Sequence, residues 1–77
     1  MATVTRFVQS TRIPKKHPSE VSCYWSVGEV DGRKLLQLDT YGSKDRQILG
    51  KQSQTLQLDK KQAEELFSIL KQYFAFK

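Results

Sequence analysis

The sequence has few of the residues that cross-link or anchor a small fold. Its 77 residues include one cysteine, one histidine, one tryptophan and two prolines. A lone cysteine, Cys23, excludes an internal disulfide, and one cysteine with one histidine cannot make a tetrahedral zinc site. Because a chain of this length buries only ~60% of its unfolded surface, it needs other support. We therefore expect a homodimer.

Long apolar runs are also absent. No stretch approaches the ~18 apolar residues of a membrane span, and residues 1–10 lack the apolar core of a signal peptide. We expect no membrane partner and an intracellular protein, in the cytoplasm or nucleoid, where a lone thiol stays reduced. The length predicts a single domain over residues 1–77.

Acidic residues are fewer than basic ones. The chain has 13 Lys+Arg against 8 Asp+Glu, a net charge of +5. This balance suits an anionic partner such as nucleic acid. The alternative is a basic surface that only keeps the protein in solution.

Catalytic and cofactor motifs are missing as well. His17 lies in a loop between Pro14 and Pro18, so no Ser-His-Asp arrangement can be argued. The glycines near residues 42–44 and 50–53 lack the spacing of a phosphate-binding loop. We expect a protein that is not an enzyme and that holds no metal or cofactor.

Two outer segments have the composition of strands. Residues 3–9 are rich in β-forming side chains and predict a first strand. Pro14 and Pro18 then interrupt any ladder, which indicates a basic loop. After a further polar loop, residues 52–58 predict a fourth strand.

The middle of the chain predicts a β-hairpin. Residues 21–30 alternate with a period of two, as a half-buried strand requires. Asp31 and Gly32 tolerate the positive φ of a tight turn. Residues 34–41 form the return strand.

The last segment changes period. Asp59 is a candidate helix N-cap, and Gln62 follows three residues later as in a capping box. Apolar residues then recur at spacings of three and four, the pattern of one helix face: Ala63, Leu66, Phe67, Leu70, Tyr73 and Phe74. The chain is predicted to be α+β, with a four-stranded antiparallel sheet followed by one C-terminal helix (β-β-β-β-α), as a dimer.

A single helix covers one face of such a sheet. We expect the helix to cover the aliphatic face, which is formed by six side chains: Trp25, Val27, Leu36, Leu38, Leu56 and Leu58. Trp25 is therefore expected to lie in the core, and Cys23 is expected to be buried as well. The opposite face is polar: Ser22, Tyr24, Ser26, Gln37, Tyr41, Thr55 and Gln57. Asp39 shares the polar face and is expected to pair with a neighbouring Lys or Arg. A one-residue bulge in the second strand would exchange the faces and make Trp25 the stacking candidate.

The polar face predicts binding of single-stranded nucleic acid. Tyr24 and Tyr41 would stack on bases, although cross-strand packing alone would also explain them. Basic side chains would contact phosphates: Lys15, Lys16, Arg33, Lys34, Lys44, Arg46 and Lys51.

The C-terminal helix suggests a different class of function. It ends in three rings that exceed what one sheet face needs, Tyr73, Phe74 and Phe76, with Ile69 beside them. The candidate interface residues are Leu66, Ile69, Leu70, Tyr73, Phe74 and Phe76. They would form the seam of the homodimer or dock another protein, such as a transcription or replication protein. The chain would then be a protein–protein interaction module.

A broader pattern joins three parts of the chain: residues 34–41 (KLLQLDTY), a Gly50-Lys51 pair, and the stretch Thr55-Leu56-Gln57-Leu58 before a helix. Over residues 21–73 the chain resembles the single-stranded-DNA-binding domain of the positive cofactor four family of transcriptional coactivators.

The resemblance implies a curved four-stranded antiparallel sheet, dimerisation largely through the helix, and binding of melted or single-stranded DNA across the sheet. By position, Tyr41 matches an aromatic residue of that family and Lys51 its loop lysine. Arg33 and Lys34 match its basic hairpin residues.

Overall fold

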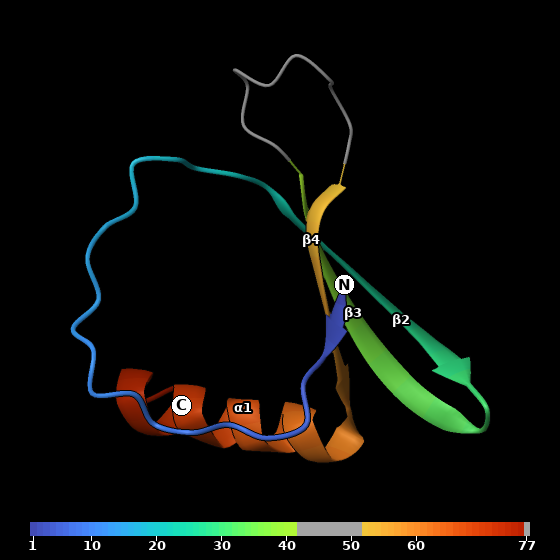
Figure 1. Cartoon of the computed structure of the whole chain (residues 1–77). Helices are drawn as coiled ribbons and strands as arrows, with labels where there is room; N and C mark the ends of the chain where they lie inside the picture. The colour runs from blue at the N-terminus through green and yellow to red at the C-terminus, as the bar shows by residue number, and fades with distance from the viewer. Residues whose placement is uncertain (42–51, 77) are drawn as a thin grey trace.

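The structure, a computed structural model, describes residues 1–41 and 52–76. Within these ranges the chain forms four strands and one helix, in the order β1, β2, β3, β4, α1 (Figure 1). The strands make one sheet with the spatial order β1-β4-β3-β2. The predicted α+β class, with a helix after the sheet, is confirmed.

The predicted first strand and the fully antiparallel sheet are wrong. β1 spans Ala2–Thr3, not residues 3–9, and it pairs with β4 in parallel, so the sheet is mixed. Val4 donates one more hydrogen bond to the carbonyl of Gln57, at 2.9 Å. The chain then leaves the sheet, because the apolar residues that follow lie against the helix.

The central hairpin is confirmed with small changes at its ends. β2 spans Cys23–Val30 and β3 spans Arg33–Tyr41. Asp31 and Gly32 between them have φ of 51° and 77°, and a type I′ turn requires both to be positive. The two strands pair over all of β2 without a shift of register. The faces of this strand are therefore those that the alternation predicts.

β4 spans Gln52–Asp59 and pairs antiparallel with β3, with one shift of register between Thr40 and Tyr41. Rows of paired residues across β2, β3 and β4 give the sheet two distinct faces. We name the apolar one the inner face: Trp25, Val27, Leu36, Leu38, Leu56 and Leu58. We name the opposite one the polar face: Tyr24, Ser26, Gln37, Asp39, Tyr41, Thr55 and Gln57.

The helix α1 spans Lys60–Phe74 and has well-formed ends. The Asp59 carboxylate accepts a hydrogen bond from the backbone N–H of Gln62 at 2.9 Å, which confirms the predicted N-cap. At the other end Ala75 adopts the left-handed conformation, with φ 55° and ψ 48°, and donates to the carbonyl of Lys71 at 2.9 Å.

Residues 4–22, which we call the arm, connect β1 to β2 by a long route. The arm starts along α1, where the Gln62 side-chain amide donates to the carbonyl of Thr5 at 2.8 Å. Phe7 then lines a shallow hollow together with Ile69 and Tyr73 of the helix. Farther on, the arm curves away from the helix and returns to the sheet at β2 (Figure 1).

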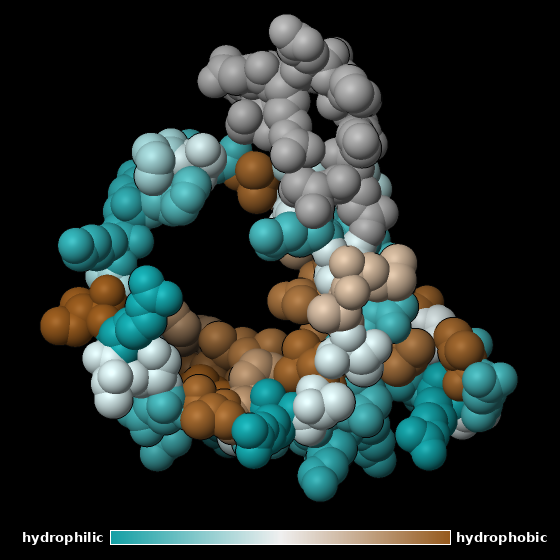
Figure 2. All heavy atoms as spheres, in the orientation of Figure 1, coloured by the Kyte–Doolittle hydropathy of each residue, from teal (hydrophilic) through white to brown (hydrophobic). Residues whose placement is uncertain are grey.

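The predicted core is incomplete, and the placement of Trp25 and Cys23 in it is wrong. α1 begins where β4 ends and points away from the sheet, so it covers only the nearby end of the inner face (Figure 1). Leu58 is 2% exposed there, whereas Trp25 is 70% exposed and Val27 69%. Cys23 is exposed too. Figure 2 shows apolar side chains bordering an opening between arm, helix and sheet.

Candidate nucleic-acid interface

The polar face carries two tyrosines at the end of the sheet remote from the hairpin turn. Tyr24 lies directly across from Asp39 in the register, and Tyr41 is the diagonal neighbour. The two rings meet edge to face, with centroids 4.9 Å apart and planes at 79°. The pair is thus packed across strands, yet Tyr24 is 61% exposed, so its ring is accessible to a flat aromatic ligand.

Asp39 organises the polar side chains beside this pair. Its carboxylate accepts from the Thr55 hydroxyl at 2.6 Å and from the Gln37 amide at 2.9 and 3.2 Å. The expectation that Asp39 pairs with a Lys or Arg is wrong among the described residues. Neutral donors on the neighbouring strand and on its own strand take that place.

The hydrogen-bonded row extends across the sheet towards β1. The Gln57 side-chain amide donates to the side-chain Oε1 of Gln37 at 2.9 Å, and the Thr3 hydroxyl donates to the side-chain Oε1 of Gln57 at 3.4 Å. Every donor in the row points in the direction of Asp39. The charge on that carboxylate therefore sets the orientation of the amides on this face.

The same hydrogen bonds act on acidity. Donation from Thr55 first, and from Gln37 second, holds the pKa of the Asp39 carboxyl below its ordinary value, against a smaller opposing effect of desolvation. Asp39 is therefore ionised at neutral pH. Its negative charge makes this part of the face unfavourable for anions and better suited to uncharged groups.

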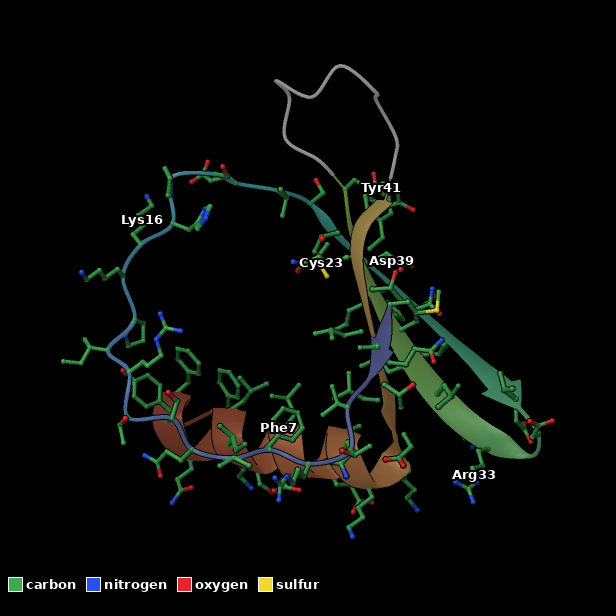
Figure 3. All side chains as sticks on the ribbon, viewed as in Figure 1. Phe7, Lys16, Cys23, Arg33, Asp39 and Tyr41 are labelled. Carbon is green, nitrogen blue, oxygen red and sulfur yellow. The ribbon has the colours of Figure 1, made fainter. Side chains whose placement is uncertain are left out.

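The predicted phosphate-binding residues fall into three groups. Arg33 and Lys34 lie at the hairpin end of β3, at the opposite end of the sheet from Tyr41 (Figure 3). Lys15 and Lys16 are exposed on the arm, and Figure 3 shows Lys16 across the opening from the sheet. They do not border the polar face. The other three predicted residues lie outside the described residues: Lys44, Arg46 and Lys51.

The predicted interface residues lie on the helix, except Phe76, which follows its end. Ile69 and Tyr73 line the hollow beside the arm. Phe74 and Phe76 stack with centroids 5.7 Å apart, and Tyr73 meets Phe74 edge to face at 5.0 Å. These rings stay exposed, Tyr73 at 80%. Leu66 and Leu70 are half-buried.

Sequence reasoning missed one charged group. Lys60 and Lys61 begin α1 and line a surface hollow together with Arg33 and Lys34 of the hairpin. The sequence does contain a signal for this group. Two consecutive lysines follow the N-cap Asp59 in the first helix turn, where acidic residues are favoured and basic ones are unusual. Only the fold shows that the hairpin brings its own two cations to the same place.

Other kinds of site find no support among residues 1–41 and 52–76. They contain no group of three or more side chains able to hold a metal ion. None of their helices is long and apolar enough to cross a bilayer. No family model, curated protein or solved structure matches the chain.

Proposed function

We propose that this protein is not an enzyme and that it binds single-stranded nucleic acid across the polar face of its sheet. It acts as a homodimer, in the manner of transcription coactivators of the positive cofactor four type. The observation that carries the proposal is the Tyr24–Tyr41 pair, with Tyr24 exposed and Tyr41 half-buried, on a sheet face of mostly neutral, hydrogen-bonding side chains.

The chemistry of this face fits unpaired bases better than a duplex. Aromatic rings stack on single-stranded bases irrespective of sequence, at about 1–3 kcal/mol per base. Most duplex readers present a helix to the major groove, but α1 turns apolar residues such as Phe67 and Phe74 outward. The amide row through Gln37 and Gln57 supplies donors and acceptors for base edges. The net charge of +5 supplies attraction for the backbone.

The dimer is supported by surface that one chain leaves uncovered. The accessible surface is 7527 Å², whereas about 4,800 Å² is usual for a compact monomer of this mass. The radius of gyration is 14.6 Å, against about 11.5 Å for a compact domain of this length. The excess is about 2,700 Å² per chain, or about 5,400 Å² for two chains, which is at the upper end of what permanent homodimers bury in total. A second copy on the inner face would bury part of this excess.

Fluorescence anisotropy tests the nucleic-acid proposal. The binding of labelled single-stranded and double-stranded oligonucleotides is measured at two salt concentrations. We expect single strands to bind more tightly than duplexes. Joint replacement Tyr24→Ala and Tyr41→Ala should weaken binding about 5- to 150-fold per stacked base and leave the salt dependence largely unchanged.

The matched control is Tyr24→Phe with Tyr41→Phe, which keeps both rings and should keep most of the affinity. Equal binding by the alanine variant and the wild type would place the site elsewhere. No binding by the wild type at low salt would refute the proposal.

The second candidate function is a protein–protein interaction module. The three packed and exposed rings after Gln72 favour it: Tyr73, Phe74 and Phe76. Phe74→Ala separates the two cases. Loss of dimerisation in this variant would assign the rings to the homodimer seam. An intact dimer that still binds oligonucleotide and no longer binds a purified transcription or replication protein would support the module.

A further inference from the structure

Four cations from two elements gather at the end of the sheet opposite to Tyr41. The hairpin contributes Arg33 and Lys34, and the first turn of the helix contributes Lys60 and Lys61. Together with Gly32 and Asp59 they line an open hollow of ≈ 680 Å³. We call these four residues the cationic end.

The lining of the hollow has a net positive charge. It holds four cations and one carboxylate, a net charge of +3. That carboxylate belongs to Asp59, the helix N-cap, and it accepts a hydrogen bond from the backbone N–H of Gln62. Glu29 lies across from Lys34 in the register. Even so, no ion pair joins a carboxylate to any of the four cations within residues 1–41 and 52–76.

Lysines at the start of a helix act against its stability. The helix dipole places positive charge at the N-terminus, where acidic side chains are favoured and basic ones are not. The first turn of α1 holds no acidic residue and two lysines, while the hairpin adds two more cations nearby. Residues that lower local stability without a compensating contact, such as these lysines, are typical of functional sites.

We propose that the cationic end is a phosphate-binding site, and that it holds a backbone phosphate of the nucleic acid whose bases lie on the polar face. Arg33 offers a planar fork of donors to phosphate oxygens, and the lysines act as mobile point charges. The open hollow admits an anion from solvent without displacing packed side chains.

The distance between the two sites suits one bound strand. Arg33 and Tyr41 are eight positions apart on β3 and therefore lie on the same face of the sheet, and eight positions correspond to roughly 26 Å of strand. An oligonucleotide that stacks on the tyrosines and follows the sheet can therefore reach the cationic end. The choice of nucleic acid as the source of phosphate rests on the proposed function, whereas the site itself rests on the four cations.

The test variant is Lys60→Gln with Lys61→Gln. The matched control, Arg12→Gln with Lys71→Gln, removes the same charge from exposed positions on the arm and in the last helix turn. Anisotropy of a labelled oligothymidine of about 16 nucleotides is measured over a range of salt. We expect the slope of log K against log salt to fall by about 1.4 in the test variant, about 0.7 per phosphate contact. The control should keep the wild-type slope.

A second measurement separates the two sources of phosphate. Inorganic pyrophosphate is titrated into isotope-labelled protein, and the backbone amide resonances of Arg33, Lys34, Lys60 and Lys61 are followed. We expect these resonances to move in the wild type and not in the Lys60→Gln, Lys61→Gln variant. Thermal melting of that variant should not fall below the wild type, because the change removes repulsion with the helix dipole.

The outcomes distinguish this site from the proposed function. If the wild type binds the oligonucleotide and the slope is the same in test and control variants, the cationic end is refuted and the polar face stands. If no oligonucleotide binds but pyrophosphate shifts the four amides, the site stands with a free phosphate compound as its ligand. If neither ligand has an effect, both proposals are wrong.

Discussion

Replacing Trp25 tests whether a second copy covers the inner face. Trp25 is the single tryptophan of the chain and is 70% exposed on the most apolar side of the sheet. Its exposed area is about 175 Å² on a tryptophan surface of up to ~250 Å². At about 25 cal/mol per Å², covering it is worth about 4 kcal/mol per chain. A two-fold dimer counts this contribution twice.

Trp25→Ala should therefore weaken the dimer far more than it weakens the fold of one chain. Association costs and imperfect packing consume part of the gain. If half is realised, the dimer loses about 4 kcal/mol, which raises its dissociation constant about 1,000-fold. Sedimentation velocity over a range of concentrations measures this constant. Far-ultraviolet circular dichroism verifies that the variant keeps its strands and helix.

Two observations complete this test. Ile13→Ala is the matched control, because Ile13 is 86% exposed on the arm and not on the inner face; it should dimerise like the wild type. The fluorescence of Trp25 itself should shift to longer wavelength when the wild type is diluted below its dissociation constant. A wild type that stays monomeric at high concentration, or a Trp25→Ala variant that dimerises normally, would refute the reasoning.

Two further predictions concern stability. Asp39→Asn should lower the free energy of unfolding at neutral pH, and the difference from wild type should narrow as pH falls below about 3.9. The fold lowers the pKa of Asp39, so protonation of the wild type at low pH removes the hydrogen bonds that its carboxylate accepts and makes it resemble the variant. Urea melts across pH measure this, and a difference in unfolding free energy that stays constant with pH would contradict it. Ala75→Gly should raise the free energy of unfolding by about 1 kcal/mol, because Ala75 has φ 55° and glycine bears no strain there. The same melts at neutral pH measure it, and an unchanged midpoint would count against a strained cap.

The parts of the fold that depend on local chemistry were predictable from the sequence. The turn at Asp31 and Gly32, the cap at Asp59 and the alternation of β2 all follow from the preferences of a few neighbouring residues. The two faces of the sheet follow as well. Successive residues of a strand point to opposite faces, so the strand register fixes the face of every side chain. Tyr24 and Tyr41 were assigned to one face on this basis, and their rings do meet.

What the sequence did not reveal depends on the direction of the helix. The alternation assigns Trp25 to the apolar face but does not say how far α1 extends over that face. Because α1 follows β4 without a loop, its axis is fixed by the junction at Asp59, and it leaves Trp25 exposed. The predicted strand over residues 3–9 is wrong beyond its first residues for a related reason, since the side chains of Phe7 and Val8 lie beside the helix rather than in the sheet. The family resemblance and the single-stranded-DNA function stay predictions.

The two proposed surfaces lie on opposite sides of one sheet, and this has a consequence for the assembly. If two chains join through their inner faces, their polar faces necessarily point outward, away from each other. Under the proposed function each Tyr24–Tyr41 pair would then bind its own strand, and the dimer would bind two. The nucleic acid would take no part in the seam, so dimerisation would affect affinity by stabilising the fold and not by adding contacts. Loss of the dimer through Trp25 and loss of stacking through Tyr24 should therefore be additive, as for independent sites.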